Sequence, residues 1–323
     1  MRAVHVLVAV VVAAIWGFNF VVIDVGVDAF PPLLFAVLRF AVAAVPAVFF
    51  VGRPCVPWRW IVVIGMTIGV GQFALLFTGM RLGMPAGLAS LVLQTQVFFT
   101  LFIAAGALGE RVRVRQLAGL GLAFAGIVLV GVDLARAGDV AGLGSGALVG
   151  FGMCVGAAGM WGLGNVAIRR AQPDDPFNLM VWTSAVAPLP LLGLSLLVEG
   201  PQADLAALAN LSWLGAGAVL YIAVLSTLVG FGLWSWLLRR YDAGVVAAYS
   251  LLVPVFGMSS AAIVLGEPLT PWRMVAAVAV VAGVALSSVK GRRDSPRGNP
   301  AAVELISRFD RSPEVDSRRT RAA

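Results

Sequence analysis

The stretch "GERVRVRQLAGLGLAFAGIVLV" at residues 109–130 is repeated, with substitutions, as "GEPLTPWRMVAAVAVVAGVALS" at residues 266–287. The two copies lie 157 residues apart, and each begins with Gly-Glu and continues into an apolar run. An apolar run of about 20 residues forms a helix that can cross the roughly 30 Å of hydrocarbon in a bilayer. The repeat therefore predicts two related halves, each ending in a membrane-spanning helix.

A second internal match supports the same division. The segment "WGFNFVV" (16–22) resembles "WGLGNVA" (161–167) at an offset of 145 residues. The offsets of 145 and 157 differ by twelve residues, which the connection within 188–212 can absorb. We therefore predict two five-helix domains, at 1–134 and 145–289.

The composition is that of a protein surrounded by lipid. Of the 323 residues, 60% are hydrophobic and only 12% are charged, with a mean hydropathy of +0.95. Soluble domains carry about 25% charged residues. The net charge of +7 would suit a nucleic-acid partner, but the basic residues flank apolar runs in short loops and a tail. We expect a lipid bilayer and no nucleic acid as the partner.

Ten apolar runs are long enough to span a membrane. They are residues 4–23, 31–51, 60–79, 84–106, 114–132, 145–168, 177–198, 213–237, 243–265 and 271–289. We interpret the first as a membrane span, since it is too long for a signal sequence. Each half holds an odd number of helices, so the second enters the membrane from the opposite side. The predicted fold is an all-α polytopic membrane protein whose ten transmembrane helices form two inverted five-helix repeats, typical of alternating-access carriers.

The basic residues predict the orientation, because cytoplasmic loops are enriched in Lys and Arg. With a cytoplasmic N-terminus, the inner loops contain Arg2, Arg53, Arg59, Arg111, Arg113, Arg115, Arg169, Arg170, Arg239 and Arg240. The outer loops contain only Arg81, Arg136 and Arg273. Both termini are therefore predicted to be cytoplasmic, in the cytoplasmic membrane. The tail 290–323 is rich in Pro, Ser and Arg, and we predict that it is disordered.

Several motifs resemble a known family. They are "WGFNFVVI" (16–23), "LRFAVAAVPAVFF" (38–50), "GMPAGLASLVLQTQVFFT" (83–100), "GERVRVRQLAG" (109–119) and "YSLLVPVFG" (249–257). In this order they resemble the drug/metabolite transporter superfamily, in its ten-helix EamA branch. The resemblance covers residues 5–289 and is strongest, across 83–119, to members that export O-acetylserine and cysteine.

This resemblance implies an inner-membrane exporter. Helices one to four and six to nine would surround a central cavity, and the fifth and tenth would pack peripherally. Asp24 in "VVIDVG" stands where the resemblance leads us to expect a lysine, which changes the charge at the outer end of the first helix.

Groups suited to catalysis are missing from the middle of the predicted membrane. All sixteen acidic residues lie at span ends, in loops or in the tail, and the single histidine, His5, lies at the inner edge of the first span. No nucleophile with a base, paired carboxylates or metal cluster can be assembled there. We predict no catalytic residue, metal or cofactor. Glu110 and Glu267 end the fourth and ninth runs, where loop capping, pairing with Arg or gating are the alternatives.

Arg39 is the one cation deep in the predicted membrane. Placing an arginine at mid-depth costs at least roughly 2.5–3.5 kcal/mol. Two interpretations are open. Arg39 could hold the carboxylate of an amino-acid-like solute, or it could bond to backbone carbonyls or water and link neighbouring helices.

A zwitterionic solute also needs a partner for its ammonium group. Amide oxygens and aromatic faces can fill this role. The candidate substrate-binding residues besides Arg39 are Gln72, Gln94, Gln96, Asn19, Asn165, Trp16, Trp161 and Trp182. Gln94 and Gln96 lie two residues apart, so they point in different directions from one helix. We expect one of them, Gln94, to face the solute and the other to tie helices together.

The sequence thus predicts a secondary-active or facilitative exporter of small amino-acid-type metabolites, such as cysteine or O-acetylserine, working by alternating access. A broad-specificity drug and metabolite efflux transporter is the alternative, and a membrane-embedded enzyme is a distant one. The sequence does not fix the oligomeric state, and we expect a functional monomer.

Overall fold

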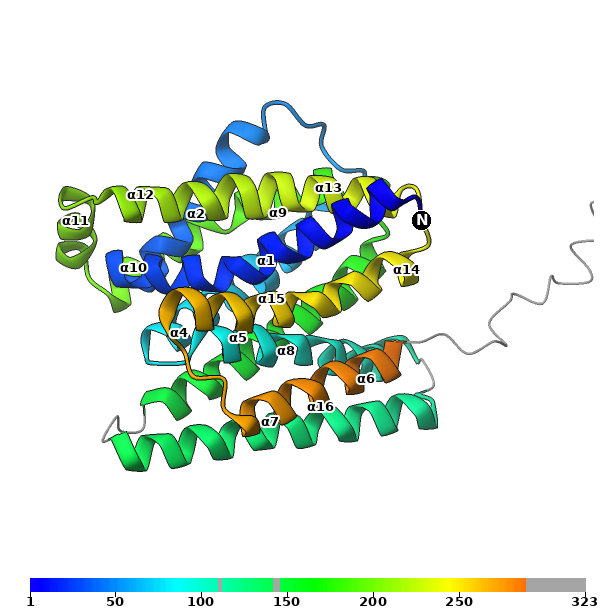
Figure 1. Cartoon of the computed structure of the whole chain (residues 1–323). Helices are drawn as coiled ribbons and strands as arrows, with labels where there is room; N and C mark the ends of the chain where they lie inside the picture. Colours follow the sequence, from blue (N-terminus) through cyan, green and yellow to red (C-terminus); the bar gives the residue numbers. More distant parts are fainter. Residues whose placement is uncertain (110–111, 142–145, 289–323) are drawn as a thin grey trace, which may run out of the picture. The chain divides into compact units, whose positions relative to one another are not determined.

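The computed structural model describes residues 1–109, 112–141 and 146–288, and every element in these ranges is helical. Glu110 and the predicted disordered tail 290–323 lie outside the described residues. The helices run back and forth along one direction, with α11 at one end of the bundle and the N-terminus at the other (Figure 1). We call these the α11 end and the N-terminal end.

Several spans of the first half consist of helical pieces that follow one another without a break. The elements are α1 (Ala3–Ala29), α2 (Pro32–Ala47), α3 (Trp58–Ile64), η1 (Gly65–Gln72), α4 (Phe73–Arg81), α5 (Ala86–Val92), η2 (Leu93–Thr95), α6 (Gln96–Leu108) and α7 (Val114–Ala141). The pieces α3, η1 and α4 form one span, as do α5, η2 and α6.

The second half is built in the same way. Its elements are α8 (Gly146–Ala171), α9 (Pro176–Val186), α10 (Pro188–Val198), α11 (Pro201–Ala209), α12 (Trp213–Leu220), η3 (Tyr221–Val229), α13 (Gly230–Leu238), α14 (Ala243–Ala247), η4 (Ala248–Leu252), α15 (Val253–Ser260), η5 (Ala261–Leu265) and α16 (Pro271–Ser288). The pieces α12, η3 and α13 form one span, and Gly244–Val264 form another.

Nine spans in the described part of the chain are long and apolar enough to cross a membrane. The predicted span 31–51 is shorter than expected, because α2 has only 16 residues and is therefore roughly 24 Å long. The backbone turns directly after Ala47 and leads into Gly52, Arg53 and Pro54, residues that favour turns. The inverted arrangement of ten crossings stays a prediction.

The helix α11 was not predicted. It lies in the connection 188–212, where the offset between the repeats changes, and the matching connection of the first half, 48–57, contains no complete helix. The twelve extra residues of the second half are thus accommodated by a short helix at one end of the bundle.

Departures from α-helical geometry recur in the two halves. Adding the repeat offset of 157 to the π-helical segment η1 gives residues 222–229. The second π-helical segment, η3, covers nearly the same residues, Tyr221–Val229. The 3-10 segment η2 likewise falls on 250–252, within η4. Interruptions of this kind often occur at functional sites. Their recurrence extends the repeat from sequence to local geometry.

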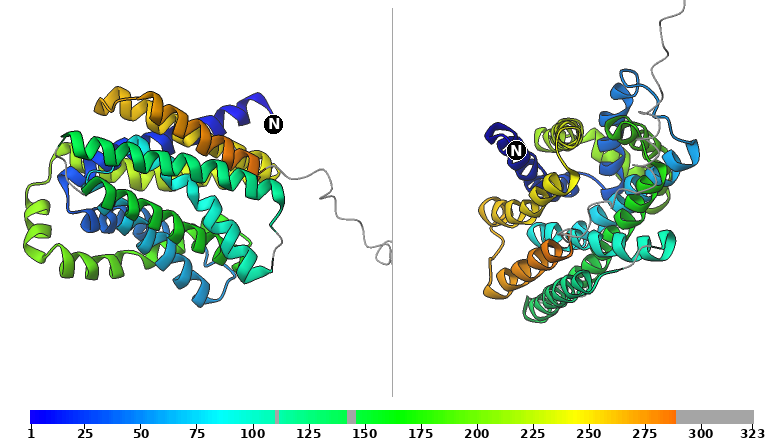
Figure 2. Two further views of the ribbon diagram at one scale, coloured as in Figure 1. Left: turned by 90° about the horizontal axis from the view of Figure 1, so that it is seen from below. Right: turned by 90° about the vertical axis from the view of Figure 1, so that its right-hand side faces the viewer.

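The repeated stretch that ends each half forms one helix pair. The helices α7 and α16 lie antiparallel, side by side at the edge of the bundle (Figures 1 and 2, green and orange). Gly126 and Gly283 occupy equivalent positions in the two copies, and both face the partner helix, Gly126 at Ala276 and Gly283 at Gly119. The small residues allow close backbone approach.

Candidate functional site

Arg39 is buried near the middle of α2, with 3% of its surface exposed. Its Nη2 donates to the Thr227 hydroxyl of η3 at 3.2 Å. Its Nε and Nη1 are buried without a hydrogen-bond partner. Among the residues that the structure describes, no carboxylate forms an ion pair with this guanidinium. The cation therefore presents two free donors inside the bundle.

Aromatic rings and the π-helical segment η3 fix the position of this guanidinium. Its central carbon lies 3.8 Å from the ring centroid of Phe73 and 5.2 Å from that of Phe40. A desolvated cation–π contact contributes about 2 kcal/mol or more. The hydroxyl of Thr227 donates to the Ile222 carbonyl at 2.7 Å, so its oxygen is left to accept from Arg39.

Two amide oxygens close to the middle of their spans are also buried without a partner. They are Asn19 Oδ1 on α1 and Gln72 Oε1 at the end of η1. Asn19 is 8% exposed and Gln72 is 3% exposed. Leaving such a polar group buried and unsatisfied costs roughly 1–3 kcal/mol, and both oxygens are free to accept from a donor.

Packing indicates that these groups lie at a similar depth. The Phe35 ring of α2 fills the space above Gly26 of α1 and packs against Phe77 of α4 at 5.2 Å between centroids. Arg39 lies one helical turn after Phe35 on α2. Phe73 lies one turn before Phe77 on α4, and Gln72 directly precedes Phe73. Asn19 lies two turns back from Gly26, on the same face of α1.

Arg39, Asn19 and Gln72 thus offer two guanidinium nitrogens as donors and two amide oxygens as acceptors, on three helical elements. A carboxylate can accept from the guanidinium, and an ammonium group can donate to amide oxygens. The groups lack a nucleophile, base or metal cluster for covalent chemistry, and the described residues contain no cluster of three metal-ligating side chains. The chemistry that these groups offer is hydrogen bonding to a polar or charged solute.

The other predicted amides have partners in the protein. Gln94 donates from Nε2 to the Ser250 carbonyl of η4 at 3.2 Å. Asn165 of α8 donates to Gln96 Oε1 at 2.7 Å and to the Thr100 hydroxyl at 3.2 Å. Both glutamines thus tie the fourth predicted span to neighbouring helices, and the expectation that Gln94 faces the solute stays a prediction.

The three predicted tryptophans have different neighbours. Trp16 donates to the Ser226 carbonyl at 3.0 Å, next to Thr227. Trp161 is half-buried against the main core. Trp182 donates to the Gly52 carbonyl at 3.2 Å and packs on Trp58, beside the loop that follows α2. Of the three, Trp16 has the contact nearest to the arginine.

Sequence reasoning missed two residues of the arginine site, Phe73 and Thr227. An aromatic ring directly after a buried glutamine was the available signal for Phe73. A hydroxyl in the middle of an apolar run was the signal for Thr227. Both signals are weak, because rings and threonines are common in membrane helices.

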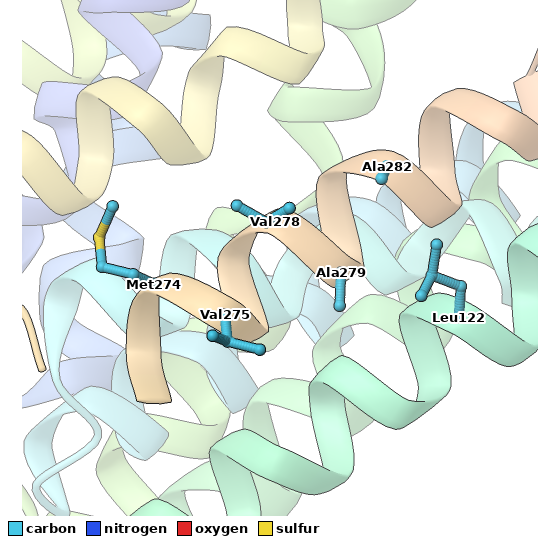
Figure 3. A pocket seen from close by; sticks show the side chains of 6 residues that line it. All are labelled: Leu122, Met274, Val275, Val278, Ala279 and Ala282. Atoms are coloured by element: carbon cyan, nitrogen blue, oxygen red, sulfur yellow. The ribbon is translucent and has the colours of Figure 1, made fainter. Parts of the chain in front are cut away.

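A groove between α7 and α16 has a different character. It encloses about 380 Å³. Its lining is Leu122, Met274, Val275, Val278, Ala279 and Ala282 (Figure 3). These aliphatic and thioether side chains offer no strong hydrogen-bonding group to a polar solute, and none of the predicted site residues lines the groove.

Comparison with known proteins agrees with this architecture. The EamA-like transporter family matches residues 4–132 and matches again at residues 148–289. The chain belongs to the EamA-like transporter family. It is therefore a multi-pass membrane protein of a transporter family, as the five motifs predicted.

Two relatives in this family carry the same descriptive name. A "Probable amino-acid metabolite efflux pump" of Salmonella typhimurium is 43% identical over 280 residues, covering 85% of this chain and 92% of the relative. The protein of that name from Escherichia coli strain K12 is 39% identical over the same length and coverage. A solved crystal structure aligns with a TM-score of 0.55 and 19% identity, over 92% of this chain and 100% of the other, which supports the fold alone.

Proposed function

We propose that this EamA-family transporter exports small amino-acid-type metabolites, of the size of cysteine or O-acetylserine, across the cytoplasmic membrane. The two halves would alternate access to a site near the membrane midplane, with both termini in the cytoplasm. The observation that carries the substrate class is the buried Arg39 with two unpartnered nitrogens. The names of the two relatives at 43% and 39% identity support it.

In this proposal each polar group has a defined role. Arg39 donates from Nε and Nη1 to the substrate carboxylate, while Thr227 and Phe73 hold the guanidinium in place. Asn19 and Gln72 receive the ammonium group through the oxygens that lack a protein partner. The free energy gained by these contacts offsets the cost of burying the cation and both amides.

Counterflow in proteoliposomes tests the proposal. Vesicles loaded with unlabelled cysteine or O-acetylserine should accumulate the labelled compound, and this exchange should need no imposed pH gradient if the carrier is facilitative. Strict dependence on a pH gradient would indicate proton antiport. Exchange of a lipophilic cationic dye without amino-acid exchange would instead favour the broad-specificity drug transporter.

The proposed ammonium contacts predict that removing them weakens transport of the amino acid but not binding of an analogue without the amino group. Gln72→Met or Asn19→Leu removes an acceptor for the ammonium group. The half-saturating concentration of the amino acid should therefore rise about 5-fold to 150-fold, the equivalent of roughly 1–3 kcal/mol. Competition by the same carboxylic acid without its amino group should not change. Gln96→Met is the control, since its oxygen serves Asn165 and its loss should lower stability without changing this selectivity. An equal loss for both ligands would contradict the assignment.

A further inference from the structure

Two helices at the α11 end begin without a cap of their own. The first backbone N–H groups of a helix need acceptors, usually from a side chain at the N-cap. Pro31 precedes α2 and Pro85 precedes α5, and neither position supplies a side-chain hydrogen bond. The helix α9 differs, because Asp175 at its own N-cap accepts from Phe177 and Asn178.

The second half of the chain supplies the missing cap of α2. The carboxylate of Glu199, directly after α10, accepts from Leu33 N–H at 2.7 Å and from Leu34 N–H at 3.1 Å. Within its own half, Glu199 is held by the Ser195 hydroxyl at 2.6 Å. One carboxylate thus joins the end of α10 to the start of the helix that carries Arg39.

A second carboxylate from the same half caps the span Ala86–Leu108. Glu267, between η5 and α16, accepts from Ala86 N–H at 2.6 Å and from Gly87 N–H at 3.1 Å. A Cβ at Gly87 would come within 3.0 Å of Glu267 Oε2, so the glycine permits this close approach. The loop of Glu267 is fixed in its own half by Arg273, which donates to the Pro268 carbonyl at 3.2 Å.

We infer that Glu199 and Glu267 form a gate at the α11 end, closed while their carboxylates cap α2 and the span from Ala86, and opened by the loss of both caps. This inference rests on the proposed alternating access between the halves. Each carboxylate is anchored in the second half and bonded to backbone of the first, so separating the halves at this end must break both sets of bonds. In the proposed orientation this is the outer end, where substrate is released.

Access to a buried position at this end tests the gate. Ser90 is 1% exposed and lies against Gly257 of α15, in the other half. In a chain with Cys55 and Cys154 replaced by serine and alanine, the Ser90→Cys reporter should react slowly with a maleimide. Ala104, fully buried in α6, supplies a second reporter, Ala104→Cys, nearer the N-terminal end.

The two caps should affect only the first reporter. Glu199→Ala or Glu267→Ala should each speed labelling at position 90 by roughly fivefold, the usual effect of losing an N-cap, and leave position 104 unchanged. Glu267→Gln keeps one acceptor oxygen and should stay within about twofold of the parent. Asp28→Asn is the matched control at the same end, because the Asp28–Arg81 pair is exposed and lies within the first half.

Unchanged labelling in both alanine variants would overturn the gate, as would equal acceleration of both reporters, which indicates a loosened fold. The assay contains no substrate, so its result is separate from the proposed function. If the alanine variants speed labelling as expected but the protein shows no amino-acid counterflow, the gate is supported and the substrate proposal is rejected. If counterflow occurs but labelling does not change, the substrate proposal is supported and the gate is rejected.

The charged groups around Glu267 should also make the opening of the α11 end depend on pH. Burial raises the pKa of Glu267, although the N–H groups of Ala86 and Gly87 and the cation of Arg273 oppose the rise and Asp24 adds to it. Arg273 is itself paired with Asp133 at 2.9 Å. Opening exposes the carboxyl to water and returns its pKa towards the usual value of about 4.3, so the closed end binds the proton more tightly.

Acid should therefore favour the closed end. The measurement is a ratio: the labelling rate of the Ser90→Cys reporter divided by the rate of the same reporter with Glu267→Gln added. This ratio should fall as the pH is lowered from roughly pH 8 to pH 5, a range above the usual carboxyl pKa. The ratio removes the pH dependence of the thiol reaction. A ratio that rises on acidification would show that the ionised carboxylate closes this end more strongly than the protonated one, contrary to the raised pKa.

Discussion

Arg39→Met is expected to abolish amino-acid counterflow while leaving the folded protein at least as stable as the parent. The substitution removes Nε and Nη1, the two buried donors without a protein partner. Hydrogen bonds to charged groups contribute about 1.5–3 kcal/mol each. Losing the contacts to a carboxylate should thus lower counterflow at sub-saturating substrate by roughly a hundredfold or more.

Stability separates the two interpretations of this residue. A cation at the centre of a membrane helix costs at least roughly 2.5–3.5 kcal/mol, and methionine can pack against Phe73 without that cost. If Arg39 serves the substrate, the variant loses transport and keeps or gains thermal stability in detergent. If Arg39 mainly links α2 to η3 through Thr227, transport and stability fall together.

Arg273→Met is the matched control, since Arg273 is also a buried arginine, 8% exposed. Unlike Arg39, it is paired, with its Nε 2.9 Å from Asp133 Oδ2. Its loss leaves a largely buried carboxylate without a partner, which destabilises a protein. We expect a lower melting temperature and counterflow that persists, although its rate can change through the Glu267 loop that Arg273 also holds. Counterflow by Arg39→Met at the parental rate would remove the carboxylate anchor.

Much of the fold could be predicted because it follows from apolar length and repetition. The repeated stretches at 109–130 and 266–287 form the α7 and α16 pair at the edge of the bundle. The segment 188–212, in which the repeat offset changes, contains α11. The π-helical segments could not be predicted. No apolar pattern encodes the change from α-helical to π-helical bonding, and the bond from the Thr227 hydroxyl to the Ile222 carbonyl accompanies it only in η3.

The candidate residues could be selected from the sequence because polar side chains are costly to bury in a membrane helix. Arg39, Gln72 and Asn19 stand out because a polar group in an apolar run needs a reason, and all three have buried atoms without a partner. Gln96 and Asn165 stood out equally but bond to each other. Sequence cannot separate these cases, because the difference depends on how two helices are rotated and which faces meet.

Gly283→Leu and Gly126→Leu are expected to cause the largest loss of stability, because both glycines lie where α7 and α16 come closest. A Cβ at Gly126 would lie 2.9 Å from the Ala276 carbonyl oxygen, and one at Gly283 would lie 2.7 Å from the Ala123 amide nitrogen. Backbone atoms cannot move aside as a flexible side chain can, so the helices must separate. Overpacking of this kind typically costs about 1–3 kcal/mol and occasionally more.

Gly121→Leu on the same helix is the matched control for this prediction, since nothing lies within 4 Å of a Cβ there. Melting temperature and folded yield in detergent should fall for the two interface variants and stay near the parent for Gly121→Leu. Because Gly126 and Gly283 are equivalent positions of the repeat, the two losses should be similar in size. The pair shares one interface, so the double variant should lose less than the sum of the single losses. If Gly121→Leu destabilised the protein as much as Gly126→Leu, added bulk on α7 would be the cause, and the close contact between the repeated helices would not explain the loss.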